Sequence, residues 1–61
     1  MTTATIILKN GYTIIRHDIH TEPECWLVSP TGQTLKRLTL GQLQTITANV
    51  GVKEVKREFY R

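Results

Sequence analysis

The sequence predicts one small α+β domain, in which two antiparallel β-hairpins, with about four strands, pack against a helix in the second half of the chain. Two runs of β-branched and apolar residues flank Asn10-Gly11, and two more flank residues 29–32. Apolar residues then recur at helical spacing after position 39. Strands joined by short turns and followed by one helix are typical of this fold class. The whole chain, residues 1–61, is expected to form a single domain.

The first hairpin is predicted from Asn10-Gly11, because this dipeptide supplies the two positive φ angles of a type I′ turn. The turn joins residues 5–9 to residues 12–16. Residues that lie opposite each other in such a hairpin share a face of the sheet. The expected opposite pairs are Ile7 with Ile14 and Ile6 with Ile15. Both faces of the first hairpin therefore carry isoleucines.

The second hairpin joins residues 25–29 to residues 33–38. Pro30 presets the first turn position, and Gly32 suits the left-handed position that follows. The expected opposite pairs are Ser29 with Gln33, Leu27 with Leu35 and Trp26 with Lys36. The polar segment 17–23 between the two hairpins is expected to be a loop.

A helix is expected over residues 40–50. Thr39 is a favourable N-cap, and Gln42 stands three residues later, as in a capping box. Gly51 is expected to end the helix, because glycine adopts the left-handed conformation that helix ends require.

The tail, residues 52–61, fits either a helix or a fifth strand. Its Lys, Glu and Arg residues favour the helix, because on a strand neither face would be cleanly apolar. On a helix, Val52, Val55 and Phe59 would form one apolar stripe. The opposite side would then gather cations and one aromatic ring: Lys53, Lys56, Arg57, Tyr60 and Arg61.

The charge of the chain favours an acidic partner. The net charge is +3, and residues 33–61 hold six cations against Glu54 and Glu58. A basic surface with one aromatic ring can contact phosphates and stack on a base. The leading hypothesis is therefore a non-catalytic module that binds nucleic acid through Lys36, Arg37, Lys53, Lys56, Arg57, Tyr60 and Arg61.

Enzymatic signatures are missing from the sequence. The segment His17–Cys25 concentrates two imidazoles, three carboxylates and one thiol, but it lacks the paired spacing that brings metal ligands together. Cys25 with His17 or His20 is the one conceivable nucleophile and base. We therefore expect no enzyme activity, no metal and no cofactor.

An alternative hypothesis is a protein-binding module, an inhibitor or assembly factor of another macromolecule. One helix covers one face of a sheet, so apolar side chains on the other face favour a further cover. Self-association into a homodimer is expected through Ile7, Tyr12, Ile14 and Trp26. A single cysteine indicates a reducing, cytoplasmic location, and without a long apolar run neither a signal peptide nor a membrane partner is expected.

Overall fold

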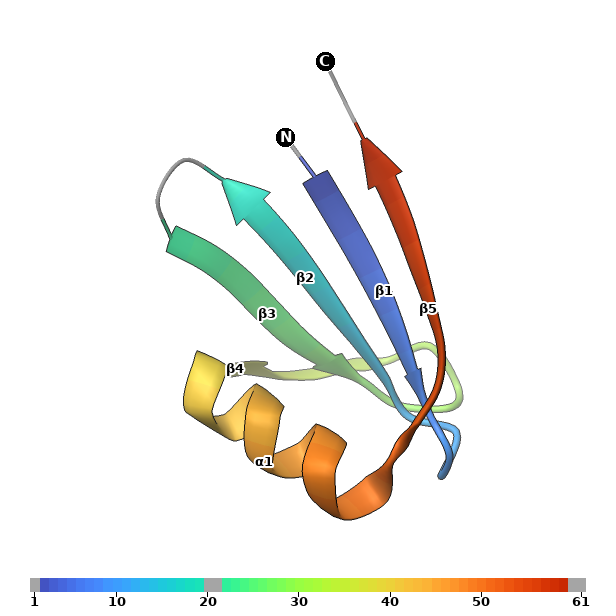
Figure 1. The fold of residues 1–61 in the computed structure, drawn as a ribbon. Helices are drawn as coiled ribbons and strands as arrows, with labels where there is room; N and C mark the ends of the chain where they lie inside the picture. Colours follow the sequence, from blue (N-terminus) through green and yellow to red (C-terminus); the bar gives the residue numbers. More distant parts are fainter. Residues whose placement is uncertain (1, 20–21, 60–61) are drawn as a thin grey trace.

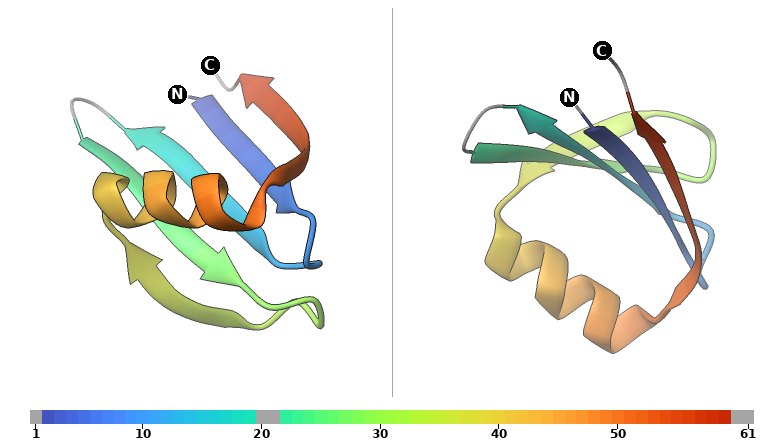
Figure 2. Two further views of the ribbon diagram at one scale, coloured as in Figure 1. Left: turned by 60° about the horizontal axis from the view of Figure 1, so that its bottom comes forward. Right: turned by 45° about the horizontal axis from the view of Figure 1, so that its top comes forward.

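The computed structural model describes residues 2–19 and 22–59 of the chain. The elements follow in the order β1 (Thr2–Leu8), β2 (Thr13–Ile19), β3 (Glu22–Val28), β4 (Thr34–Leu38), α1 (Leu40–Val50) and β5 (Val52–Phe59). The five strands form one antiparallel sheet in the order β4-β3-β2-β1-β5 (Figure 1). Helix α1 crosses one face of this sheet (Figure 2). The predicted α+β class is confirmed.

Helix α1 begins and ends where the sequence predicts. The backbone N–H of Gln42 donates to Thr39 Oγ1 at 3.2 Å, and the backbone N–H of Thr39 donates to Gln42 Oε1 at 3.0 Å. These two hydrogen bonds complete the capping box. At the other end Gly51 has a φ of 91°, and its N–H donates to the Thr47 carbonyl oxygen at 3.0 Å. A side chain at position 51 would also press on the stem of Lys9. Glycine therefore suits this position on both counts.

The turn between β1 and β2 has three residues rather than the predicted two. The Gly11 N–H donates to the Leu8 carbonyl at 3.1 Å, and the Leu8 N–H donates to the Tyr12 carbonyl at 2.8 Å. Gly11 has a φ of 91°, which suits a turn followed by one left-handed residue, the common form of a three-residue hairpin loop. The type I′ prediction is therefore wrong, and the register moves by one residue. The observed pairs are Ile6 with Ile14 and Thr5 with Ile15.

The turn between β3 and β4 is confirmed, but the register beyond it is not. The Gly32 N–H donates to the Ser29 carbonyl at 2.9 Å, and the Ser29 N–H donates to the Gln33 carbonyl at 2.8 Å. A bulge then shifts the pairing by one residue and leaves Leu35 without a partner on β3. Leu35 is 47% exposed as a result. In place of the predicted pairs, the structure has Leu27 opposite Lys36 and Trp26 opposite Arg37.

Strands β2 and β3 extend through the segment predicted as a loop. His17 pairs with Glu24, and Asp18 pairs with Pro23, so most of residues 17–23 belongs to the sheet. The polar composition was misleading because these strands continue past the last residue that β4 pairs, where a half-solvated strand tolerates polar side chains. A proline also fits there, because one side of β3 has no neighbouring strand to hydrogen-bond.

The tail forms strand β5, so the preference for a helix is wrong. β5 pairs antiparallel with β1 along its length, and the Lys9 N–H donates to the Gly51 carbonyl at 3.0 Å where the tail joins the sheet. Helix propensities differ by less than about 1 kcal/mol per residue, so the pairing with β1 overrides them. Residues 60 and 61 lie outside the described residues.

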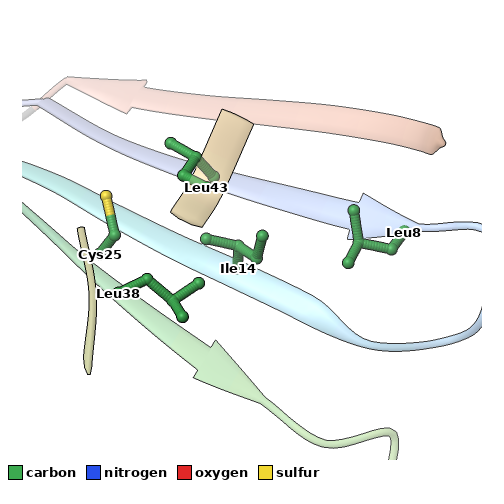
Figure 3. Close-up of a cluster of buried hydrophobic side chains, with 5 residues drawn as sticks. All are labelled: Leu8, Ile14, Cys25, Leu38 and Leu43. Carbon is green, nitrogen blue, oxygen red and sulfur yellow. The ribbon is translucent and has the colours of Figure 1, made fainter. Parts of the chain in front are cut away.

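The core lies between α1 and the sheet (Figure 3). Its buried side chains come from every described element except β5: Leu8, Ile14, Cys25, Leu38 and Leu43. Ile14 is 0% exposed and lies at the centre of the sheet, whereas Ile15 is half-buried on the opposite face. The one-residue register shift thus decides which of these two isoleucines enters the core.

We predict that Ile14→Val lowers the free energy of unfolding by about 0.5–1.5 kcal/mol, because it removes a methylene from a fully enclosed site. The matched variant Ile15→Val should cost less than about 0.5 kcal/mol, because Ile15 is half-buried. Urea unfolding followed by the fluorescence of Trp26, the single tryptophan, measures both values. A larger loss at Ile15 than at Ile14 would contradict the observed register.

Candidate functional site

The two faces of the sheet carry different charges. The face beneath α1, here called the helix-side face, has Arg16, Lys36 and Arg57 against Asp18. The opposite face is here called the outer face. Among the paired residues whose side chains the structure describes, it has two cations against three acids: Arg37, Lys56, Glu24, Glu54 and Glu58. Among these described side chains, the net positive charge lies on the helix-side face.

One row of side chains crosses the helix-side face from β4 to β5. Leu38 and Cys25 belong to the core, and Arg16, Ala4 and Arg57 continue the row on β2, β1 and β5. Neighbouring strands lie about 4.8 Å apart, so the backbones that carry Arg16 and Arg57 are roughly 10 Å apart. The small side chain of Ala4 leaves a depression between the two arginines.

That depression is part of a groove with a volume of about 330 Å³, here called the arginine groove. Its lining residues come from β1, β2 and β5 and none from α1. These three strands lie side by side in the sheet (Figure 1). Its lining combines apolar side chains, one hydroxyl, one carboxylate and two guanidinium groups: Thr2, Ala4, Ile6, Arg16, Asp18, Val55 and Arg57. Such a surface suits a ligand with an anionic group and an apolar part.

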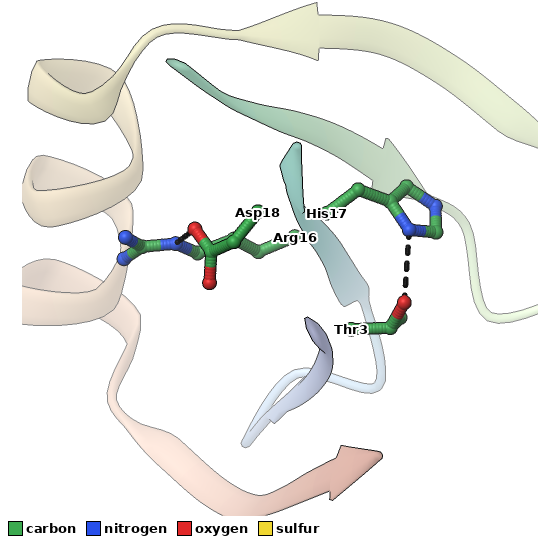
Figure 4. A network of polar contacts seen from close by, with 4 residues as sticks. All are labelled: Thr3, Arg16, His17 and Asp18. Carbon is green, nitrogen blue, oxygen red and sulfur yellow. Dashed lines mark hydrogen bonds and ion pairs between the residues drawn. The ribbon is translucent and has the colours of Figure 1, made fainter. Parts of the chain in front are cut away.

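Asp18 orients Arg16 within this groove. Arg16 Nε donates to Asp18 Oδ1 at 3.0 Å, and both side chains extend toward α1 (Figure 4). This contact uses Nε and leaves the two terminal nitrogen atoms of Arg16 to a ligand. Arg57 makes no hydrogen bond or ion pair with any other described residue. Each of the two guanidinium groups can therefore donate to an oxyanion.

The outer face is apolar at its centre and charged at its margins. Ile7, Ile15, Trp26 and Val28 occupy neighbouring positions on β1, β2 and β3, and all four are half-buried. At one margin the Arg37 and Glu24 side chains approach to 4.0 Å. Elsewhere on this face His17 Nδ1 and Thr3 Oγ1 form a hydrogen bond of 3.0 Å (Figure 4).

The structure separates the residues predicted to contact nucleic acid. The predicted cationic surface required the tail to be a helix. The tail is strand β5, and successive side chains of a strand point to opposite faces of the sheet. Lys36 and Arg57 lie on the helix-side face, but on the two edge strands of the sheet. Arg37 and Lys56 lie on the outer face, and Lys53 lies at a bulge of β5. Tyr60 and Arg61 fall outside the described residues.

Sequence reasoning missed Arg16, which is the residue that completes the arginine groove. It belongs to the net acidic half of the chain, so a search for clustered cations passes over it. The available signal was the alternation of β2, because Arg16 lies two residues after the buried Ile14 and therefore on the same face.

The predicted association patch also needs correction. Ile14 is fully buried, and Tyr12 packs against the core cluster, so neither belongs to the outer face. The cause is again the three-residue turn, which pairs Ile14 with Ile6 rather than with Ile7. Of the four predicted residues, Ile7 and Trp26 remain on the outer face.

Among the described side chains, the residues considered for catalysis and metal binding do not converge. Cys25 lies on the helix-side face and His17 on the outer face, so the sheet separates this thiol from this imidazole. Within residues 2–19 and 22–59, no three His, Cys, Asp or Glu side chains are placed to hold one metal ion. His20 falls outside the described residues.

Comparisons with models of protein families, with curated proteins and with solved structures find no match for this chain. No helix in the described part of the chain is long and apolar enough to cross a membrane. The candidate site therefore rests on the geometry and charge of the chain itself.

Burial raises the pKa of the Cys25 thiol above its ordinary value, and the nearby Arg16 offsets part of this rise. The unfolded chain therefore loses this proton at a lower pH than the folded protein does. The contribution of the neutral thiol to stability is complete below the ordinary value of 9.0 and declines as the pH rises through the raised value in the folded state.

We predict that the free energy of unfolding falls more steeply above pH 9.0 in the natural chain than in the Cys25→Ala variant. Urea unfolding at neutral and alkaline pH gives both slopes, and the variant differs from the natural chain only in the loss of the thiol. Equal slopes would show that the Cys25 thiol has the same pKa in the folded and unfolded states.

Proposed function

We propose that this chain is a non-catalytic binding module for nucleic acid, and that a phosphate backbone lies in the arginine groove. The observation that carries this proposal is the row in which Arg16 and Arg57 flank Ala4 on the net positive face of the sheet. Arginine suits this role because its planar guanidinium group can donate two parallel hydrogen bonds to a phosphate.

The shape of the groove favours a single strand over a duplex. The floor between the arginines is apolar, formed by Ala4, Ile6 and Val55, and can contact a sugar or an unstacked base. α1 crosses the same face beside the groove, which restricts the approach of a wide duplex (Figure 2). Recognition of this kind depends on phosphate charge and has little sequence preference.

We predict that Arg57→Gln weakens binding to a short single-stranded oligonucleotide. If Arg16 and Arg57 each neutralise one phosphate, the logarithm of the binding constant should fall with the logarithm of salt concentration with a slope of roughly −1.4. Removing one contact should reduce the magnitude of this slope by about 0.7. Fluorescence anisotropy of a labelled oligonucleotide across a salt series measures both slopes.

The matched control is Arg37→Gln, which removes the same charge from the outer face. It should leave the salt slope unchanged within error. An equal effect of the two substitutions would show a general attraction to the protein rather than binding in the groove. Absence of any binding at ~50 mM salt would contradict the proposal itself.

A second candidate function is binding of another protein on the outer face. The observation in its favour is the half-buried apolar side chains Ile7, Ile15, Trp26 and Val28 at the centre of this face, with charges of both signs at its margins. An apolar centre with a polar margin is the usual composition of a protein interface. Such a partner would bury side chains that α1 leaves uncovered.

Trp26 distinguishes the two candidates, because it is the single tryptophan and lies on the outer face. We predict that saturating the chain with the oligonucleotide leaves the wavelength of maximum tryptophan emission unchanged. A protein bound over the outer face would shift this maximum to shorter wavelength by removing water from the indole ring. A shift caused by the oligonucleotide would instead move the nucleic-acid site to the outer face.

A further inference from the structure

Strand β5 forms one edge of the sheet, and among the described residues no strand pairs with its free side. Free strand edges can hydrogen-bond to another chain, and natural proteins protect them with charged side chains. β4, the opposite edge, has Lys36 and Arg37 and no acid, so two copies of β4 would repel each other. β5 carries both signs, which makes it the edge that can pair with itself.

We propose that β5 pairs antiparallel with β5 of a second copy of this chain, with Val55 opposite Val55 about a twofold axis. In this register Glu54 of each copy lies opposite Lys56 of the other on the outer face, so two ion pairs flank the axis. Opposite charges at directly opposed strand positions are stabilising. The interface is isologous, as a twofold dimer requires.

The charges of β5 exclude the neighbouring registers. A twofold axis moved to Lys56 would place Lys56 opposite Lys56 and Glu54 opposite Glu58. An axis moved to Glu54 would place Glu54 opposite itself. Like charges at directly opposed positions are destabilising, so both neighbouring registers are disfavoured relative to the one centred on Val55. In the register centred on Val55, β5 is therefore complementary in charge to β5 of a second copy on the outer face.

The helix-side face supplies one favourable and one unfavourable contact. Val55 is 44% exposed beside Ile6, and pairing buries it against the same residue of the second copy. Arg57 of each copy lies opposite Lys53 of the other, so two like-charged pairs oppose this register. Both pairs fall at the bulge, where Lys53 has no partner on β1. A strand edge buries a small area, so the dimer is weak and depends on concentration.

The dimer would place both arginine grooves on one continuous face. A twofold axis perpendicular to the sheet keeps both copies of α1 on the same side. The grooves then lie on either side of the axis, with Arg16 and Arg57 of each copy along one extended sheet. This consequence rests on the proposed function, whereas the dimer itself rests on β5 alone.

Sedimentation of the chain from about 5 µM to 1 mM tests the dimer without any ligand. The weight-average mass should rise from 7.0 kDa toward twice that value. Glu54→Lys and Lys56→Glu each place like charges opposite one another, and each should raise the dimer dissociation constant roughly tenfold. The double variant restores the opposite charges and should return the constant to within about threefold of the natural value.

Circular dichroism and urea unfolding confirm that each variant folds before its mass is measured. A strict monomer at 1 mM would overturn the proposal. So would a dimer that neither single substitution weakens, or one that the double variant fails to restore. A dimer lost in Trp26→Ser but not in Glu54→Lys would assign self-association to the outer face instead. None of these results changes the Arg57→Gln test, so the two proposals fail separately.

Discussion

The three-residue turn at Gly11 determines the face to which each side chain of β2 points relative to β1. Because side chains alternate along a strand, a change of one residue in this turn would exchange the pairing partners of every β2 residue. The observed turn aligns Ile14 with Ile6 and Arg16 with Ala4 on the side of α1. The core and the arginine groove are thus consequences of one backbone arrangement, and His17 lies on the outer face for the same reason.

Local signals in the sequence were enough to predict the elements whose chemistry is local. Thr39 and Gln42 form a capping box, and Gly51 ends the helix, because each acts on backbone groups within one turn. The turn at Ser29 to Gly32 is likewise confirmed. The tail was harder to predict, because its strand depends on the free edge of β1, which is more than forty residues away in the chain.

The candidate site followed less readily from the sequence, since it joins residues from three strands. A count of cations identified the basic half and hence Arg57, but it passed over Arg16, whose neighbours in sequence are acidic. It also grouped Arg37 and Lys56 with Arg57, although the strands turn them to the other face. Alternation and register, rather than the density of charge along the chain, decide which cations meet.

The proposed function depends most on the arginine groove as the place where a nucleic acid binds. Amide chemical-shift mapping by NMR during titration with a single-stranded oligonucleotide tests this directly. We expect the largest shifts at residues lining the groove on β1, β2 and β5, namely Ala4, Ile6, Arg16 and Arg57. Shifts concentrated at Thr34, Arg37 and the indole N–H of Trp26, with the groove unchanged, would contradict it.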